Sequence, residues 1–459
     1  MDTRTETDSM GEIEVPTSAY YGAQTARSLI HFNIGHDKFP DLVIRSYALL
    51  KRAAAEVNCE LGLLSEQKKQ WIVEAAEEVR EGRWKEHFPL SIWQTGSGTQ
   101  TNMNVNEVIA NRAIELAGGE KGSKTPIHPN DDVNMSQSSN DSFPTVMHMA
   151  AVEMFTHRFL PMVRKLQKTL LEKEKEFSGI VKIGRTHLMD AVPITLGQEF
   201  SGYVAQITQS LERLETVLPP LYELAIGGTA VGTGLNAPKG FAEKVVEKLA
   251  QFTHFPFVPA SNKYFALATH DPLVAAHAMI KTLACSLIKI VTDLSFLGSG
   301  PRCGLGELIF PANEPGSSIM PGKVNPTQCE ALTMIAVHVL GNDQAISIAG
   351  SRGNFELNVF KPMILHNFLD SMLLISDGLR SFTEYFLVGL KANQKQIDHY
   401  LQNSLMLVTA LTPVIGYEKA AKAAHYAYEH DVSLKEACQA LSLLPDKEFD
   451  SFVRPESMT

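Results

Sequence analysis

The chain has 459 residues, of which 44% are hydrophobic and 20% charged, a composition ordinary for a soluble globular protein. A chain of this length exceeds one hydrophobic core and predicts about three domains. The formal net charge of −10, with no cluster of Lys and Arg, argues against nucleic-acid binding. An anionic ligand would therefore need a local positive site.

The five cysteines, Cys59, Cys285, Cys303, Cys329 and Cys438, are odd in number, and no two are spaced as Cys-x-x-Cys. This spacing argues against a disulfide framework, a zinc site and an iron–sulfur cluster. The first residues carry acids and lack the apolar stretch of a signal peptide. We therefore expect no metal, a reducing compartment and a cytoplasmic location.

Residues 1–137 combine turn signals with helical stretches such as 42–61, where apolar residues recur at helical spacing. Long helical patterns follow, and several are apolar on most faces, so they need packing partners on more than one side. We infer a bundle shared between subunits. The most apolar pattern carries two lysines and an aspartate, which favours a bundle helix over a membrane span. The patterns cover residues 144–177, 195–224, 272–297 (the most apolar), 327–348 and 362–388.

The tail is more charged and has shorter helical patterns, such as 432–443, which predicts a small separate domain. The expected fold class is mainly α. The expected division is an N-terminal domain over 1–137, a central helical bundle over 138–393 and a small C-terminal helical domain over 394–459.

The most informative segment is 316–326, Gly-Ser-Ser-Ile-Met-Pro-Gly-Lys-Val-Asn-Pro, a turn-rich loop before an apolar helix. Its glycines give the backbone freedom and its prolines stiffen it. Such a loop can direct several backbone N–H groups and the Lys323 ammonium at one point, where they would stabilise a developing negative charge. A plain surface turn, with Asn325 as N-cap and Pro326 at the first helical position, explains the same residues.

Two further stretches place hydroxyls and carboxamides just before predicted helices. The free N–H groups of a helix N-terminus bind carboxylates well, although plain N-capping explains either stretch alone. The residues are Ser97, Thr99 and Asn102 before a helix over 103–117, and Ser138, Ser139 and Asn140 before a helix that begins at Pro144.

Two other motifs have simple alternative explanations. His187 lies in a short segment before the 195–224 helix, and a lone histidine in a loop is more often solvated than catalytic. Residues 227–234 contain Gly-x-Gly, as dinucleotide-binding loops do. A helical pattern with Pro219 and Pro220, and not a strand, precedes them, however, and no strand–helix alternation follows. This argues against a nucleotide site.

Together these motifs resemble the fumarase/aspartase superfamily, whose members eliminate a group next to a carboxylate-stabilised carbanion. The wider string 313–330 resembles class II fumarate hydratase in particular, and the resemblance runs from about residue 10 to past residue 390. Agreeing stretches are 21–25 (Tyr-Gly-Ala-Gln-Thr), 94–102, 128–134, 136–141 and 184–187.

The resemblance implies a three-domain fold whose long central helical bundle is shared across a homotetramer. It implies reversible, stereospecific hydration of fumarate to L-malate, a step of the tricarboxylic acid cycle, by a hydro-lyase that uses no cofactor. The implied partners are small dicarboxylates, with neither nucleic acid nor membrane, and each active site is built from three chains.

The resemblance also implies the roles of individual residues. Ser317 is expected to abstract the C3 proton of malate, and Lys323 with Asn325 to stabilise the resulting aci-carboxylate. His187 is expected to act on the departing hydroxyl, with Glu330 holding its other ring nitrogen. The expected substrate-binding residues are Ser97, Thr99, Asn102, Ser138, Ser139, Asn140, Thr186, Ser318 and Asn325.

Two alternatives remain at this point. Aspartate ammonia-lyases resemble this chain nearly everywhere but commonly carry Gln at the position of His187. A non-catalytic bundle is the other alternative, since superfamily members serve as lens proteins. Intact Ser317, Lys323 and Glu330 argue against that role.

The chain departs from the family pattern at two places. His128, Pro129, Asn130 and Asp131 resemble a second dicarboxylate site of some members, but Thr125 and Pro126 replace the basic residues often found before it. A structured turn explains this motif equally well. Phe265 stands where the family usually has Glu, and nothing in the sequence explains that change.

Overall fold

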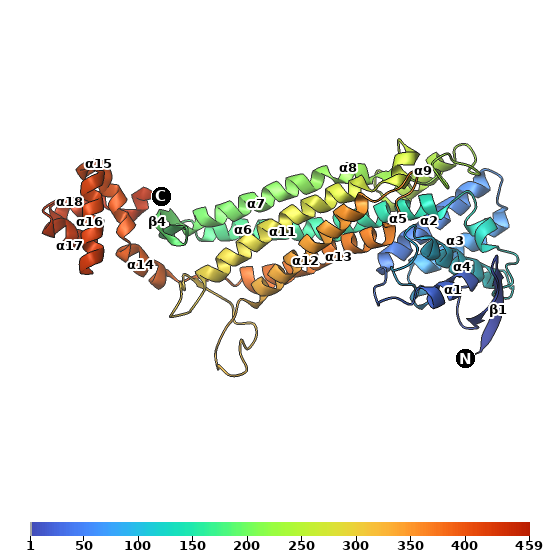
Figure 1. Cartoon of the computed structure of the whole chain (residues 1–459), viewed down its shortest axis with the longest axis horizontal. Helices are drawn as coiled ribbons and strands as arrows, with labels where there is room; N and C mark the ends of the chain where they lie inside the picture. The colour runs from blue at the N-terminus through green and yellow to red at the C-terminus, as the bar shows by residue number, and fades with distance from the viewer. Residues whose placement is uncertain (1) are drawn as a thin grey trace. The chain divides into compact units, whose positions relative to one another are not determined.

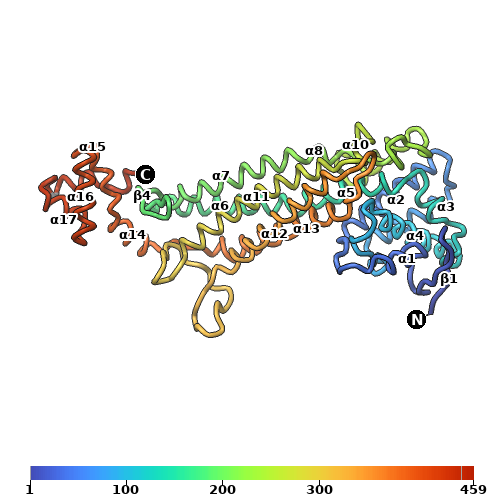
Figure 2. Tube along the Cα trace, in the orientation of Figure 1, coloured from blue at the N-terminus to red at the C-terminus, as the bar shows by residue number. Residues whose placement is uncertain are grey.

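The computed structural model describes residues 2–459, so Met1, the first residue of the expected N-terminal domain, lies outside the described residues. The described chain is mostly helical, which confirms the mainly α fold class, and its strands form two-stranded sheets. Figure 1 shows its path as a cartoon and Figure 2 as a tube.

The chain divides into two compact units, each assembled from three separate segments. Unit 1 comprises Met1–Leu160, Glu212–Thr282 and Val337–Leu374, and unit 2 comprises Pro161–Leu211, Leu283–Ala336 and Ile375–Thr459. Because each unit combines three separate segments, the two units do not test the boundaries predicted for continuous domains. The three domains with boundaries after residues 137 and 393 stay a prediction.

The elements follow one another in this order. The first half contains β1 Thr3–Asp8, β2 Gly11–Pro16, α1 Ala23–His31, α2 Asp41–Glu60, α3 Glu66–Arg80, η1 Lys85–His87, α4 Thr99–Leu116, η2 Pro129–Val133, α5 Ser139–Met154, η3 Phe155–Phe159, α6 Leu160–Glu176, β3 Val181–Thr186, β4 Met189–Thr195, α7 Leu196–Thr216, α8 Leu218–Leu221 and β5 Glu223–Leu224. The second half contains α9 Phe241–Thr253, β6 Val258–Pro259, α10 Lys263–Ala268, α11 Asp271–Leu297, β7 Leu308–Ile309, α12 Thr327–Gly350, α13 Lys361–Ser381, η4 Phe382–Leu387, β8 Lys391–Ala392, α14 Gln394–Asn403, η5 Leu405–Leu411, α15 Thr412–Ile415, α16 Tyr417–His430, α17 Leu434–Ala440, α18 Asp446–Phe452 and η6 Pro455–Met458.

The core of unit 1 is built around α2, the helix predicted over 42–61. Its buried Val43, Tyr47, Leu50, Ala54 and Val57 recur every three or four residues and therefore share one face. The ring of Tyr47 packs edge-on against Phe143 of α5, with ring centroids 6.1 Å apart. This packing fixes α5 beside α2.

Helices α4 and α5 begin earlier than their sequence patterns predicted. Helix α4 starts at Thr99 rather than at 103, and α5 starts at Ser139 rather than at Pro144. The reason at α5 is a capping box, in which the Ser138 hydroxyl and the Asp141 carboxylate each accept a backbone N–H at the helix start. Pro144 therefore lies inside α5 rather than at its start, and it has no backbone N–H to donate to the helix.

The five long helical patterns are confirmed, with shifted ends. The pattern over 144–177 is α5 and α6 joined by the wider turn η3, and the pattern over 195–224 ends early, at Thr216, before the short α8. Helix α12 runs over 24 residues and α11 over 27 residues. Helices α7, α11, α12 and α13 each have residues in both units.

Helix α11 is the one helix among the described residues that is long and apolar enough to cross a membrane. It nevertheless carries the titratable side chain of His277, which is fully buried, 3.0 Å from Asp343 Oδ1 and 3.0 Å from Ser371 Oγ. Such internal polar bonds are typical of a helix in a protein core, as expected from the sequence.

In unit 2, aromatic side chains join the residue after α6 to the first part of α7, and the first part of α7 to the last part of α11. The rings of Phe177 and Phe200 lie 5.1 Å apart, and the Tyr203 hydroxyl donates to Asp293 Oδ2 at 3.0 Å. The C-terminal helices of the same unit bury a second apolar cluster that includes Leu411, Ala423 and Cys438.

Candidate active site

The N-termini of α4 and α5 are joined by a chain of hydroxyl groups in unit 1. Ser97 Oγ lies 2.7 Å from Thr99 Oγ1, which lies 2.7 Å from Ser139 Oγ of α5. Gly98 permits the close packing, because a β-carbon there would lie 2.0 Å from the Phe143 ring and its φ is +77°. Because α4 begins at Thr99, its first N–H groups lie among these hydroxyls.

The α5 terminus is held by the glycine-rich segment 227–234. Asp141 is fully buried, and its Oδ2 accepts the N–H groups of Gly227 at 2.9 Å and Thr229 at 2.8 Å. The Asn140 side chain donates to Ala230 O at 2.8 Å. The glycine-rich segment thus supports the residues at the start of α5.

The expectation that no strand precedes this glycine-rich segment was wrong. The two-residue strand β5 precedes it, and β5 pairs in parallel with β6, which follows α9. Two of the loop's N–H groups are nevertheless committed to the Asp141 carboxylate, which would also repel a phosphate. The argument against a dinucleotide site therefore stands on this geometry.

His187 lies at the tip of the β3–β4 hairpin in unit 2. The tip is a two-residue turn, in which His187 has φ +57° and Leu188 φ +60°, between the paired residues Thr186 and Met189. Positive φ at both positions is unusual without glycine or asparagine, and such strain is often found at functional sites. The His187 and Thr186 side chains are exposed.

Buried ion pairs anchor the base of this hairpin. Lys182 Nζ lies 3.2 Å from Glu199 Oε2 and 3.3 Å from Glu307 Oε2, and Arg185 donates to Glu307 Oε1 at 2.7 Å. Burial raises the pKa of the Glu199 carboxyl, and the Lys182 ammonium opposes that rise. The hairpin tip is therefore held on a firm base through Glu307, just before β7.

The loop over 316–326 is an exposed, internally bonded turn in unit 2, and Figure 1 shows it extending away from the helices between α11 and α12. Ser317 Oγ accepts two backbone N–H groups, from Ile319 at 3.2 Å and Met320 at 3.0 Å. Gly316 N donates to Lys323 O at 2.9 Å, and the Lys323 ammonium forms no hydrogen bond or ion pair with any described residue.

Asn325 does not cap the following helix. Its Nδ2 donates to Gly316 O at 2.7 Å, and α12 begins at Thr327 with Pro326 O accepting from Glu330 N. The plain reading of Asn325 as an N-cap is therefore wrong, and its carboxamide closes the loop instead. Ser318 and Glu330 are exposed.

The predicted site residues fall in both units. Unit 1 holds Ser97, Thr99, Asn102, Ser138, Ser139 and Asn140 and brings them together at two helix ends; unit 2 holds Thr186, His187, Ser317, Ser318, Lys323, Asn325 and Glu330 on two separate segments. No described residue forms a hydrogen bond or ion pair with the His187 ring, so the expected contact with Glu330 is not made within one chain.

The second dicarboxylate site also stays a prediction. His128 Nδ1 accepts the N–H groups of Asn130 and Asp131, at 3.3 and 3.1 Å, so it caps the turn η2. A cavity of about 230 Å³ lies beside this turn, and its lining includes the acids Glu6, Asp8 and Glu107. Lys124 lines the cavity too, but its ammonium is bonded to Thr7.

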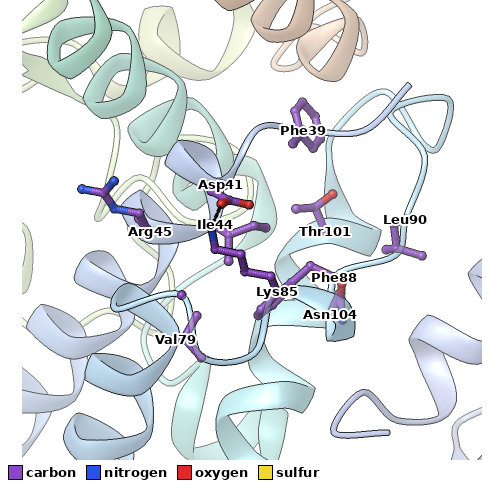
Figure 3. Close-up of a pocket in the computed structure, with 11 residues that line it drawn as sticks. Phe39, Asp41, Ile44, Arg45, Val79, Lys85, Phe88, Leu90, Thr101 and Asn104 are labelled. Carbon is purple, nitrogen blue, oxygen red and sulfur yellow. Dashed lines mark ion pairs between the residues drawn. The ribbon is translucent and has the colours of Figure 1, made fainter. Parts of the chain in front are cut away.

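A separate pocket lies on another side of α4 (Figure 3). At about 50 Å³ it is too small for a four-carbon dicarboxylate, and an ion pair between Asp41 and Lys85 lies beside it. The polar groups of α4 that line it are bonded to the protein, Thr101 to Gln94 and Asn104 to His87 O. This pocket is therefore not a substrate site.

Three features of the site region were missed from the sequence. Lys51 is fully buried beside Asn102, Asp141 anchors the glycine-rich segment, and Glu307 anchors the hairpin. Buried charged residues give no periodic signal of their own. The one sign visible in the sequence was Lys51, a charged residue on the otherwise apolar face of α2. Phe265 is 45% exposed on α10, and nothing in the structure explains why it replaces Glu.

Comparisons with known proteins support one family. Residues 11–341 match the lyase family, and residues 407–459 match the fumarase C C-terminus family. The chain is 62% identical to the class II fumarate hydratase of Thermosynechococcus vestitus, over 100% of this chain and 98% of that protein. It is 58% identical to the mitochondrial fumarate hydratase of Rattus norvegicus, over 99% of this chain and 90% of that protein.

Solved structures agree with this assignment. The class II fumarase of Schistosoma mansoni has a TM-score of 0.96 and 46% identity, covering 100% of this chain and 99% of that chain. A fumarate lyase:delta crystallin from Brucella melitensis, bound to cobalt, has a TM-score of 0.95 and 38% identity, covering 100% of this chain and 99% of that chain. The chain therefore belongs to the class II fumarate hydratase family of lyases.

Proposed function

We propose that this chain is a fumarate hydratase, a hydro-lyase that reversibly adds water to fumarate to give L-malate in the tricarboxylic acid cycle. The observation that carries the proposal is the loop over 316–326. It combines a serine oxygen that accepts two N–H groups with a lysine ammonium that no described residue pairs. That combination suits a reaction that removes a weakly acidic proton beside a carboxylate.

Ser317 abstracts the C3 proton of malate in this mechanism. A serine hydroxyl is a weak base at neutral pH, so its alkoxide must be stabilised by donors and a nearby cation. The N–H groups of Ile319 and Met320 are such donors, and the Lys323 ammonium belongs to the same loop. Lys323 and Asn325 then hold the second negative charge that develops on the substrate carboxylate.

His187 protonates the departing hydroxyl, with Glu330 of a neighbouring subunit orienting the imidazole. Support comes from the exposed hairpin tip, whose positive φ angles hold the histidine outward from a firm base. Thr186, beside it, and Ser318, in the loop, contact the substrate. In this proposal the hairpin tip and the loop over 316–326 carry the groups that transfer protons, and the helix ends in unit 1 bind the substrate.

The substrate carboxylate is bound at the N-termini of α4 and α5. Ser97, Thr99 and Ser139 offer linked hydroxyls that can donate to a carboxylate, and the helix ends add partial positive charge. Asn102, Ser138 and Asn140 complete this binding surface. These groups give a chain of net charge −10 the local attraction for an anion that it needs.

The active unit in this proposal is a homotetramer in a cytoplasmic location, with each site drawn from three chains. The long helices support it, because α12 exposes Met334 at 68% and Val337 at 56%, one helical turn apart. Covering such side chains with the helices of other subunits would bury them. An active monomer in analytical ultracentrifugation would disprove the composite site.

A complementation experiment tests the composite site directly. The variants His187→Asn and Ser317→Ala are each expected to be inactive, and their mixed tetramers, formed after reversible dissociation, should regain part of the activity. Activity returns because some sites then receive an intact histidine from one chain and an intact serine from another. Mixing either variant with itself under the same conditions is the control, and no recovery in the mixture would contradict the proposal.

The reaction itself is tested by following loss of the fumarate double-bond absorbance, with and without ammonia. We expect consumption without ammonia, L-malate as product, and no ammonia release from aspartate. Ammonia-dependent consumption would favour aspartate ammonia-lyase, the second candidate, against which His187 argues. Activity should survive EDTA, because every proposed step uses only side chains and backbone groups; its complete loss would overturn this mechanism.

A further inference from the structure

One ammonium group lies buried behind the helix end that carries the proposed binding residues. Lys51 of α2 is 0% exposed, and its Nζ donates to Asn102 Oδ1 at 2.8 Å, Asn134 Oδ1 at 3.0 Å and Gln137 Oε1 at 3.0 Å. An ammonium has three N–H donors, whereas a neutral amine has two and a lone pair. Three oxygen acceptors therefore match the charged form.

One negatively charged group, Asp141, acts on the Lys51 ammonium. Burial lowers the pKa of Lys51 to about 7, and the negative charge of Asp141 on α5 works against that fall. The other groups in contact with the ammonium are neutral carboxamides, and the Tyr47 ring centroid lies 5.9 Å away. The hydrogen-bond geometry is that of the protonated side chain, because each acceptor is an oxygen without a proton of its own.

Lys51 determines how Asn102 is oriented. The oxygen and nitrogen of an asparagine amide can exchange places by a flip, unless the neighbours distinguish them. Asn102 Oδ1 accepts from Lys51 and from Ser142 Oγ, at 3.1 Å, and Asn102 Nδ2 donates to Asn134 Oδ1 at 3.1 Å. A flip would place the amide N–H groups against the ammonium and would cost these bonds.

This orientation suits an anionic substrate. With Oδ1 held by two donors, Asn102 keeps one N–H of Nδ2 that no described residue accepts. Asn102 is in the first turn of α4, as is Thr99, so this N–H belongs to the helix end where the linked hydroxyls lie. The buried positive charge also acts over a longer range than a solvated one, since little water screens it.

We propose that Lys51 is a positioning residue for the substrate carboxylate: it fixes the carboxamide of Asn102 as a donor and supplies a positive charge behind the N-termini of α4 and α5. The inference rests on the proposed function and deepens it. Lys51 does not touch the substrate; it acts through Asn102 and through its field.

The experiment compares Lys51→Met with the wild-type tetramer. Loss of a bond to a charged group costs about tenfold or more in binding. We therefore expect the KM for fumarate, and the Kd for the dicarboxylate succinate by calorimetry, to rise about tenfold, while kcat falls less than about threefold. In the Asn102→Ala background the same change should raise KM by a smaller factor, because the two residues act together.

A milder pair of variants keeps the test available if Lys51→Met does not fold. Ser142→Ala removes the second donor to Asn102 Oδ1 and should raise KM by about threefold, in proportion to one ordinary hydrogen bond. Thr145→Val is its matched control on the same helix, because among the described residues its hydroxyl is bonded to Asp141 O alone. That variant should leave KM unchanged.

The outcomes separate the inference from the proposed function. Wild-type protein that binds succinate and hydrates fumarate, together with an unchanged KM in Lys51→Met and Ser142→Ala, would overturn the role of Lys51 alone. Independent, multiplicative effects of Lys51→Met and Asn102→Ala would also overturn it. Wild-type protein that neither hydrates fumarate nor binds succinate would instead remove the proposed function.

Discussion

The two regions that carry the predicted site residues are built in opposite ways. The helix ends in unit 1 are closely bonded: Ser97, Thr99 and Ser139 form one hydroxyl chain, and Asp141 and Lys51 are fully buried behind them. The hairpin tip and the loop over 316–326 in unit 2 are exposed, and most of their polar bonds are local. In the proposed mechanism, the binding groups are therefore positioned by the fold of one chain, whereas the reacting groups need another subunit and the substrate.

The largest expected effect is on the reacting groups. A positioned acid or base contributes about 10²–10⁴-fold in rate, so Ser317→Ala and His187→Asn should each lower kcat by at least about 10²-fold. Both side chains are at least partly exposed, so thermal unfolding should change little. Glu330→Gln should lower kcat less, because the imidazole stays in place but loses its oriented partner. Steady-state kinetics at a fixed pH measures all three.

Isotope exchange separates the two roles. Ser317→Ala should abolish exchange of the malate C3 proton with solvent. If Ser317→Ala kept near wild-type kcat while His187→Asn abolished that exchange, the assignment would be reversed, and His187 would be the base that acts on carbon.

The next effect should appear in binding rather than in turnover. Thr99→Val removes the central hydroxyl of the chain that joins α4 to α5, so the hydroxyls of Ser97 and Ser139 each lose a partner. A hydrogen bond to a charged ligand contributes about 1.5–3 kcal/mol, so KM should rise about tenfold or more. Because the loop over 316–326 is untouched, kcat should remain within about threefold.

Thr101→Val is the matched control for this change. Its hydroxyl is bonded to Gln94 and lines the small pocket of Figure 3, away from the hydroxyl chain. It should cost about 1 kcal/mol of stability and leave KM unchanged. A KM change in Thr101→Val as large as that in Thr99→Val would remove the distinction between the two sides of α4.

Much of this arrangement could be predicted from the sequence because it follows from local rules. The apolar period of α2 and of the long helices predicted their existence, and the hydroxyl–carboxamide stretches lie at helix N-termini as predicted. The starts of α4 and α5 were predicted less well. Gly98, with a positive φ, is the N-cap of α4, and the capping box of Ser138 and Asp141 starts α5 before Pro144. The existence of the helices was therefore predicted better than their ends, and the roles of the site residues stay a prediction.

What could not be predicted are pairings between distant parts of the chain. Nothing near Lys51 in sequence indicates that Asn102, Asn134 and Gln137 surround it, and nothing near Asp141 indicates the glycine-rich segment. These partners are brought together by tertiary packing, which single-sequence spacing does not encode. The same limit applies to the contact between His187 and Glu330, which stays a prediction.

A smaller effect concerns stability: acidification should lower the free energy of unfolding through a buried histidine in unit 1. His270 is 1% exposed, and its Nε2 has no hydrogen-bond partner in residues 2–459. Burial lowers the pKa of its ring well below 6.5, and the Lys361 charge adds to that fall. As the pH falls through 6.5, the unfolded chain takes up this proton before the folded one. The free energy of unfolding must therefore decrease on acidification.

His270→Leu tests this because it removes the titrating ring. At pH 7.5 the variant should be within about 1 kcal/mol of wild type, since removing Nε2 leaves no described partner unpaired. At pH 5 the variant should be the more stable of the two in chemical denaturation, and hydrogen exchange should place the difference in peptides of unit 1. Equal stability differences at the two pH values would show that the pKa of His270 is the same in the folded and the unfolded chain, and would contradict the prediction.

The smallest effect concerns the hairpin tip, where the comparison between the regions is sharpest. Leu188 is 78% exposed and has φ +60°, so it contributes strain and little burial. Leu188→Gly should relieve strain of about 1 kcal/mol, partly offset by the greater freedom of glycine in the unfolded chain. A net gain below about 1 kcal/mol is therefore expected in thermal unfolding. Leu188→Ala keeps a β-carbon at positive φ and should show no gain.

If the tip holds His187 outward by its backbone angles, kcat should survive Leu188→Gly, because glycine adopts the same angles. If kcat fell while stability rose, the stiffness of the Leu188 backbone itself would be part of how unit 2 presents its histidine.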